Sequence, residues 1–305
     1  MKSALKHAIS EYILPPGITR TIKTLTQREQ TSSPSPQALP EIIEKAKSNV
    51  RFKDIHKGER CFILATGPSV KDQNLKNLAN EYCISVSHFY LHPDFSIIKP
   101  NYHVIAPAHP PFESQKLTKL FQGIKSRDDL GTEFFLGQTN FIHSTHNFLC
   151  QVPELKPTNF NYINYTGAPH LSAQNHQQTE VWDISRNPFS IRTVVYSALQ
   201  LAAYMGFSKV FLLGADMNHI CTVQQGYTPH FYKEEKGIND AEQRKNNSVD
   251  MEKMLLGAHK NFLGFRLIRE HLEGNNGMRI YNCSPTSLLD VFERIDFNDA
   301  IKQSS

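Results

Sequence analysis

Side chains suited to stabilising a departing phosphate are concentrated in one short segment. Tyr227, His230 and Tyr232 lie within six positions of one another, and phenol and imidazole groups can donate hydrogen bonds to charge that develops on a leaving group. His259 lies beside Ala258, at the border of the apolar face of a predicted helix. An imidazole with an ordinary pKa of about 6.5 can act as a general base. An aromatic surface loop and a histidine bordering the core explain the same residues without function.

A glycine-containing turn follows the first apolar run, Arg60–Ala65. In this turn, Thr66–Ser69, Gly67 permits close backbone approach, and Ser69 followed by Asp72 has the spacing of a capping box that opens a helix. A helix N-terminus here would offer N–H groups to a phosphate, although a tight strand-to-helix turn explains the residues equally well. The turn is neither a P-loop nor a G-x-G-x-x-G segment, which removes the main support for an ordinary ATPase or a dinucleotide-binding enzyme.

Polar groups also follow two later strands. Asp216 and Asn218 come after an apolar run, where an acid can serve a ligand or cap neighbouring backbone groups. The turn Ser284–Ser287 follows another predicted strand. Ser284 and Pro285 suit the N-cap and first position of a helix, which accounts for the turn without function. Its hydroxyls could equally hold a sugar or a phosphate.

A framework of alternating strands and helices from about residue 58 must position these groups. Residues 194–205 are apolar on nearly every side, as in a buried helix, and Gly206 suits the position after its end. Strands that are apolar on both faces and separated by helices imply a mostly parallel sheet covered on each side. The expected fold is a doubly wound α/β fold, with ligands bound beyond the carboxyl ends of the strands. The predicted strands are Arg60–Ala65, Tyr82–Val86, Tyr102–Ala106, Lys209–Leu213 and Met278–Tyr281.

Helices complete the framework. One is predicted after the first turn and reaches Leu78, and another follows the turn at Ser284. Residues 127–190 have weak periodicity and are expected to form loops, short helices and at most one strand. A long amphipathic helix is predicted late in the chain, with one side formed by Met251, Met254, Leu255, Ala258, Phe262, Phe265 and Leu272.

The beginning of the chain differs from the rest. Residues 1–57 are assigned to an amphipathic helix and a linker that contains Thr31–Pro36. The helix could lie on a membrane surface through residues 1–25, or pack on the main domain or on a second copy of the chain. Residues 58–300 are assigned to the α/β domain, with residues 217–250 as a lid or an active-site insertion.

The composition limits the class of protein. The 305 residues carry 33 Lys and Arg against 29 Asp and Glu, a balance too mild for a nucleic-acid binder with a clustered basic face. Hydrophobic residues make up 39%, which excludes global disorder, and no apolar run approaches the ~18 residues of a membrane span. The five cysteines form no C-x-x-C pair, which favours buried thiols in a reducing compartment. We expect a cytoplasmic globular protein.

Several islands of sequence resemble the bacterial sialyltransferases of glycosyltransferase family 42. Related to that family is a group described as 6-hydroxymethylpterin pyrophosphokinase-like, often encoded among surface-polysaccharide genes. The family's first strand ends in Gly-Asn-Gly-Pro-Ser, where this chain has Ala65–Ser69. Its second strand ends in Asn followed one residue later by Phe-Tyr, where this chain has Ser87–Tyr90. Thr193–Asp216 is similar throughout, and Ile280–Leu289 resembles the closing strand and turn.

Two further islands carry histidines. Gly257–Asn261 falls where the family places its catalytic-base histidine, and His230–Tyr232 is similar to a His-Phe element of the second group. The chain departs from the family at Thr66 and Ser87, which stand where the family uses Asn side chains to hold a cytidine nucleotide. Hydroxyls have shorter reach and offer one group instead of two, so the identity of the nucleotide stays open.

The resemblance implies a metal-independent, inverting glycosyltransferase. It would transfer sialic acid, Kdo or a related nonulosonate from a CMP-activated donor to a glycan acceptor, such as lipopolysaccharide or another surface polysaccharide. In this scheme His259 is the base and His230 its rival, Tyr227, His230 and Tyr232 assist departure of the phosphate, and Asp216 orients the donor or the base. The residues assigned to the donor nucleotide are Thr66, Gly67, Pro68, Ser69, Ser87, Thr193, Asn218, Ser284, Thr286 and Ser287. No metal or other cofactor is expected.

Two other functions stay open at this point. One is a Mg²⁺-dependent pyrophosphokinase acting on a pterin, for which Asp216 is the only well-placed metal ligand. The other is a non-catalytic module that binds a sugar or a nucleotide within a polysaccharide assembly complex. The sequence does not define the acceptor, the linkage or the oligomeric state, and a homo-oligomer is left open.

Overall fold

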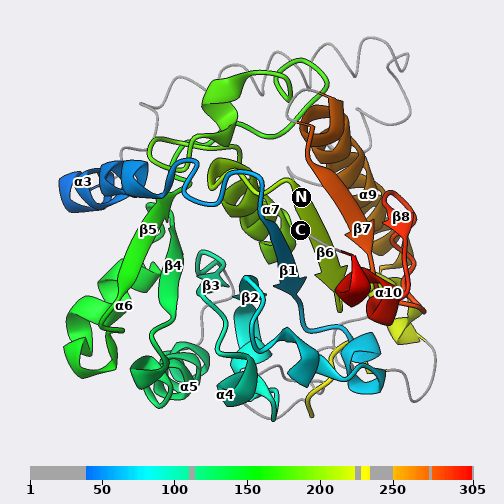
Figure 1. The fold of residues 1–305 in the computed structure, drawn as a ribbon. Helices are drawn as coiled ribbons and strands as arrows, with labels where there is room; N and C mark the ends of the chain where they lie inside the picture. The colour runs from blue at the N-terminus through cyan, green and yellow to red at the C-terminus, as the bar shows by residue number, and fades with distance from the viewer. Residues whose placement is uncertain (1–38, 110–113, 224–227, 234–249, 275–276, 304–305) are drawn as a thin grey trace, which may run out of the picture. The chain divides into compact units, whose positions relative to one another are not determined.

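The computed structural model describes residues 39–109, 114–223, 228–233, 250–274 and 277–303. Within these residues, eight strands form one sheet in the order β5-β4-β3-β2-β1-β6-β7-β8, and neighbouring strands are parallel throughout (Figure 1). The predicted doubly wound α/β fold is confirmed. The strands are β1 (Arg60–Leu64), β2 (Cys83–Val86), β3 (Tyr102–Ile105), β4 (Glu133–Gln138), β5 (Phe160–Asn164), β6 (Lys209–Leu213), β7 (Arg279–Asn282) and β8 (Glu293–Arg294).

The strand order reverses beside β1. The chain adds β2 to β5 on one side of β1 and then returns to add β6, β7 and β8 on the other side. In an open parallel sheet, the crevice outside the carboxyl ends of the strands at such a reversal is the usual ligand site. The loops that follow β1, β2 and β6 are therefore the expected place for a ligand site.

Helices cover both faces of the sheet. Since successive strand residues point to opposite faces, Phe62 and Ile63 of β1 belong to different core clusters. The cluster with Ile63 contains α7 and α9, and the cluster with Phe62 contains α4, α5, α6 and α10. This covering is why the strands are apolar on both faces. The helices are α3 (Pro40–Lys47), α4 (Phe95–Ile98), α5 (Ser114–Lys125), α6 (Thr145–Gln151), α7 (Val194–Tyr204), α9 (Met251–Gly274) and α10 (Phe297–Lys302).

The buried helix predicted over residues 194–205 is confirmed as α7. Its residues are buried on nearly all sides, and Gly206 adopts a left-handed φ of 85° after the helix ends. The helix predicted after β1 was wrong, because two 3₁₀ helices, Pro68–Asp72 and Leu75–Leu78, replace it.

The prediction of at most one strand in residues 127–190 was also wrong, because this region contains both β4 and β5. Gln138, Asn161 and Asn164 lie in these strands and are buried. Buried polar side chains interrupted the apolar runs by which strands are recognised from sequence.

The packed α/β unit includes residues before position 58, where the domain was expected to begin. Ile42 and Ala46 of α3 are buried, and Asn49 Nδ2 donates to the carbonyl oxygens of Tyr162 at 2.8 Å and Ile184 at 3.0 Å. These residues therefore belong to the α/β unit and not to a linker. The predicted N-terminal helix and the segment Thr31–Pro36 lie outside the described residues.

Only part of the predicted apolar side of α9 is buried. Ala258 and Phe265 belong to the core, whereas Met251 is 43% and Leu255 52% exposed. The helix has 24 residues, about 36 Å at 1.5 Å per residue, while a four-residue strand such as β7 spans only about 13 Å. The first turns of α9 therefore extend past the edge of the sheet. No helix in the described part of the chain is long and apolar enough to cross a membrane.

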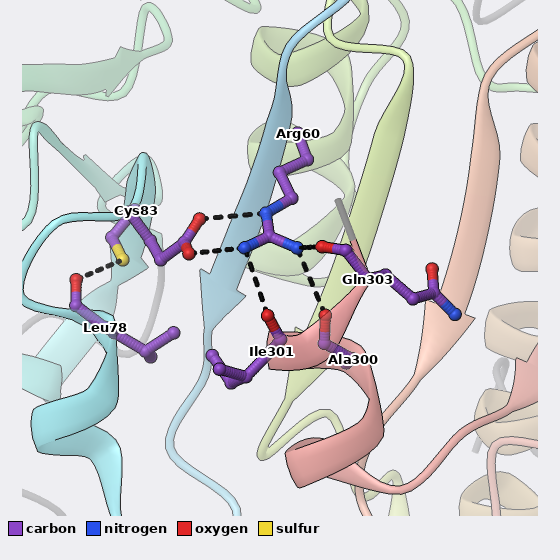
Figure 2. A network of polar contacts seen from close by, with 7 residues as sticks. Arg60, Leu78, Cys83, Ala300, Ile301 and Gln303 are labelled. Atoms are coloured by element: carbon purple, nitrogen blue, oxygen red, sulfur yellow. Dashed lines mark hydrogen bonds and ion pairs between the residues drawn. The ribbon is translucent and has the colours of Figure 1, made fainter. Parts of the chain in front are cut away.

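Arg60 fastens the last helix to the start of β1. Figure 2 shows its guanidinium beside the backbone of Ala300, Ile301 and Gln303, and the guanidinium also forms an ion pair with the Glu81 carboxylate. Nε and Nη2 donate to Glu81 at 3.0 and 2.5 Å, and the carbonyl oxygens of Ala300, Ile301 and Gln303 accept the remaining hydrogen bonds. A cation at this position compensates the negative end of the helix dipole.

All five cysteines are free thiols. The prediction of buried thiols holds for Cys61, Cys83 and Cys283 but is wrong for Cys150, which is exposed, and for the partly exposed Cys221. Burial raises the pKa of the Cys61 and Cys83 thiols well above the ordinary value, so these two are unreactive core residues.

Candidate functional site

The turn after β1 is tied to the loop after β6. Gly67 N donates to Gly214 O at 2.8 Å, Ser69 N to Asp216 Oδ2 at 2.9 Å and Ser69 Oγ to Asp216 Oδ1 at 2.5 Å. The predicted capping box is therefore wrong, because the Ser69 side chain bonds Asp216 instead of its own helix. The N–H groups of Gly67 and Ser69 are thus engaged within the protein, and Pro68 has none.

Gly67 is required by close packing of these two loops. A Cβ atom at this position would lie 2.4 Å from Gly214 O and 2.5 Å from Asp216 Oδ2. The close backbone approach predicted for Gly67 is real, but it is made to protein and not to a ligand. Asp216 is 3% exposed. Its two carboxylate oxygens accept hydrogen bonds from Ser69 N and Ser69 Oγ, as expected for a residue that caps neighbouring backbone groups.

The turn after β7 continues this network. Ser284 Oγ accepts from Gly214 N at 2.9 Å, and Ser287 Oγ donates to Ala215 O at 3.0 Å. Asn218 Nδ2 donates to Thr286 O at 3.0 Å. The structure thus brings these predicted donor-binding residues together, but their polar groups join loop to loop. Ser284 does not begin a helix as predicted; the last helix begins after the Asp296 N-cap.

Four side chains from three segments meet beyond the carboxyl ends of β1 and β2. Thr66 Oγ1 lies 3.2 Å from His230 Nδ1, and the His230 and Tyr232 rings are stacked with centroids 4.9 Å apart. The His88 ring centroid lies 5.5 Å from that of Tyr232. We call Thr66, His88, His230 and Tyr232 the histidine–tyrosine cluster. It concentrates hydroxyl and imidazole groups at the edge where a ligand is expected.

The backbone between the two rings holds the cluster in place. Phe231 N donates to Thr66 O at 3.0 Å. The Phe231 side chain turns to the core, where its ring centroid lies 5.8 Å from Phe89 and 5.2 Å from His92. Phe231 is thus anchored in the core, and the rings of His230 and Tyr232, the residues before and after it, stack on each other.

The turn after β2 supplies His88, which the sequence analysis did not include among the site residues. Its ring lies next to Ser87, whose Oγ is 3.1 Å from His88 Nδ1. Burial, and then the nearby His230, lower the pKa of His88 to about 4. The ring is therefore neutral at pH 7 and offers one donor and one acceptor. Its position directly after a predicted strand was the signal that could have identified it.

Two residues at this edge have left-handed backbone although they are not glycine. Ser87 has φ 54° and Met217 has φ 53°, and they follow β2 and β6. Such conformations cost of order 1 kcal/mol or more, and they concentrate at functional sites. Both loops that flank the turn of β1 therefore carry backbone strain.

His259 and Thr193 lie on elements other than those that form the cluster. His259 is exposed on the first half of α9, and within the described residues it makes no hydrogen bond or ring contact with the cluster. A helix that connects parallel strands runs antiparallel to them, so the N-termini of α7 and α9 lie at the same edge as the cluster. Thr193, half-buried, precedes α7 there. Tyr227 and most of the predicted lid lie outside the described residues.

Two cavities of the size that holds small ligands lie elsewhere. One of about 500 Å³ borders Ser284, with Asp72 and Arg294 in its lining. The other, of about 710 Å³, lies at the opposite edge of the sheet beside Trp182 and Lys57. Across the described ranges, no group of three or more His, Cys, Asp or Glu side chains could hold a metal ion.

Searches against protein-family models and against curated proteins find no match. Among solved structures, the chain is similar to the Campylobacter jejuni sialyltransferase CstII in complex with the substrate analogue CMP-3FNeuAc, at 17% identity and a TM-score of 0.46, over 81% of this chain and 89% of that one.

It is also similar to the monofunctional α-2,3-sialyltransferase Cst-I from Campylobacter jejuni, at 14% identity and a TM-score of 0.46, over 81% and 83% of the two chains. A third similar structure is CST-II in complex with a trisaccharide acceptor and CMP, at 15% identity and a TM-score of 0.43, over 81% and 89%. The strand order of this chain by itself establishes the α/β fold.

Proposed function

We propose that this protein is a glycosyltransferase that transfers sialic acid, Kdo or a related nonulosonate from a CMP-activated donor to a glycan acceptor. The observation that carries the proposal is the histidine–tyrosine cluster beside the reversal of strand order. Its members come from the islands that resemble family 42 sialyltransferases and the related group, and these islands are far apart in the sequence.

The cluster suits departure of a nucleoside monophosphate. A CMP-activated sugar leaves with one phosphate, whose negative charge grows as the glycosidic bond breaks. The Tyr232 hydroxyl and the imidazoles of His230 and His88 can donate hydrogen bonds to that charge. Hydrogen-bond donors placed in advance can do this without a divalent cation, so we expect transfer to proceed in EDTA.

The acceptor needs a base on the face opposite the phosphate, because the reaction we propose inverts the anomeric carbon. We assign this role to His259, which the resemblance implies and which is exposed to solvent from which an acceptor can arrive. It would remove the hydroxyl proton as the oxygen attacks. His230, already in the cluster, is the rival.

Asp216 takes a different role from the one first assigned to it. Both of its carboxylate oxygens accept from Ser69, so it fixes the turn after β1 and thereby the position of Thr66. The same engagement argues against a Mg²⁺-dependent pterin kinase, for which Asp216 was the best-placed metal ligand. A non-catalytic binding module is an outcome of the experiment below.

The experiment offers the purified protein CMP-sialic acid, CMP-Kdo and ATP, each with and without EDTA. Release of CMP that persists in EDTA and rises with a glycan acceptor supports the proposal. Mg²⁺-dependent formation of AMP would indicate the kinase instead. Binding of CMP-sugars without any turnover would indicate a module that only binds them.

The two histidines make the assignment of the base testable. We expect His259→Ala to lower the transfer rate by a factor of about 10² or more while donor affinity is kept, since a general base contributes to the chemical step. Transfer rates and donor dissociation constants of His259→Ala and His230→Ala are measured side by side. Normal transfer by His259→Ala together with loss in His230→Ala would make His230 the base.

A further inference from the structure

We propose that His103 is a positioning residue for this site: it holds the turn at Ser87 so that the His88 imidazole faces the His230–Tyr232 pair. The catalytic role of the turn at Ser87 rests on the proposed function. The positioning itself depends only on contacts within the chain. His103 lies on β3 and contacts no member of the histidine–tyrosine cluster.

His103 is completely buried, and both of its ring nitrogens meet groups of the β2 segment. Nε2 lies 3.0 Å from Ser87 O, and Nδ1 lies 2.6 Å from Ser85 Oγ. Because a carbonyl oxygen can only accept, Nε2 carries the proton. Nδ1 is then an acceptor, and the Ser85 hydroxyl donates to it.

The ring cannot move away from these partners. Its centroid lies 6.2 Å from that of Phe95 and 5.7 Å from that of Phe134, both in edge-on contact. Burial also lowers the pKa of His103 to about 3, so the ring stays neutral at physiological pH. His103 is thus a permanent donor to Ser87 O.

Ser87 needs such a donor because its backbone is left-handed. A φ of 54° disfavours a residue with a Cβ atom, and such a conformation persists only where the surroundings over-determine it. Ser87 also begins the 3₁₀ helix Ser87–Leu91. Without the N–H of His103, its carbonyl loses the partner on β3, and the strained start of this helix can relax. Ser87 Oγ would then leave His88 Nδ1, and the His88 ring would lose its orientation beside Tyr232.

Three variants test this role. His103→Phe keeps a ring of similar size but removes the donor, whereas the side-chain N–H of His103→Gln stands the same number of bonds from Cα as Nε2 and can restore it. Phe134→Leu loosens the packing of the same ring without changing a polar contact. We expect His103→Phe to lower kcat by about tenfold or more with a nearly unchanged KM for the CMP donor, since a displaced group costs rate more than binding.

His103→Gln should recover most of that kcat, and Phe134→Leu should lose stability while keeping kcat. Wild-type kcat in His103→Phe, or equal losses in the Phe and Gln variants, would overturn the positioning role. Spectra of protein labelled with ¹⁵N-histidine provide a readout independent of turnover. The His88 resonances should shift in His103→Phe and return in His103→Gln, and unchanged resonances in both variants would refute the proposal. A wild-type protein that turns over no CMP-sugar would refute only the proposed function.

Discussion

The Thr66 hydroxyl joins the turn of the first strand to the histidine–tyrosine cluster. Its Oγ1 lies 3.2 Å from His230 Nδ1, and this contact orients the imidazole. Thr66→Val is close to isosteric and removes the hydroxyl. We expect transfer activity to fall about fivefold, because a hydrogen bond of about 1 kcal/mol orients the ring. Thr66→Ser keeps the hydroxyl and should stay near wild type in the same assay; equal activity of both variants would refute the role.

Gly67 offers a second test at the residue scale. Gly67→Ala places a methyl group 2.4 Å from Gly214 O, so the two loops must separate, and we expect a loss of about 1–3 kcal/mol in the free energy of unfolding. Gly257 is the matched control, because a Cβ there would meet nothing within 4 Å. Gly257→Ala in α9 should be neutral or slightly stabilising. Urea denaturation measures both, and similar midpoints for the two variants would contradict the packing argument.

At the scale of the elements, Arg60 of β1 anchors α10 through hydrogen bonds to its last carbonyl oxygens. Arg60→Met leaves the half-buried Glu81 carboxylate and three carbonyl oxygens without their cation, so we expect a loss of about 3–5 kcal/mol. Lys302→Met removes an exposed ion pair with Asp299 in the same helix and should cost under about 1 kcal/mol. Thermal or urea unfolding compares the two. An equal effect of both substitutions would show that Arg60 does not anchor the helix.

The elements also show what sequence patterns can establish. β1, β6 and α7 are continuous apolar runs, so they could be predicted closely. β4 and β5 could not, because the buried polar residues Gln138 and Asn164 interrupt their apolar pattern. Gln138 Oε1 accepts from His146 N, and Asn164 Oδ1 accepts from Thr166 N. The same holds for Asp216 and Ser284, whose types suggested ligand binding. Their partners lie in other loops, and no spacing in the sequence reveals which polar group already has a partner.

At the scale of the whole molecule, buried histidines make the fold sensitive to acid. Burial lowers the pKa of His103 to about 3 and is the main reason why those of His88 and His271 fall to about 4. The unfolded chain takes up protons near pH 6.5, whereas the folded chain resists until far lower pH. Stability is therefore complete above about pH 6.5 and is lost progressively as the pH falls toward 4.

Urea denaturation at pH 7.5, 6, 5 and 4.5 measures this dependence. We expect the free energy of unfolding to decrease across that series, and His103→Gln to make the decrease shallower because one titrating group is gone. A wild-type free energy that stays constant between pH 7 and 4.5 would contradict the burial of neutral imidazoles.

The bond between Arg60 and the last helix has a consequence for synthesis in the cell. β1 is the central strand, yet its guanidinium finds carbonyl partners only when Gln303 has been added to the nascent polypeptide. Its neighbour β6 is likewise translated long after it. A ribosome that pauses late in the message would thus carry a chain whose sheet centre is still exposed, which is a substrate for chaperones rather than a folded protein.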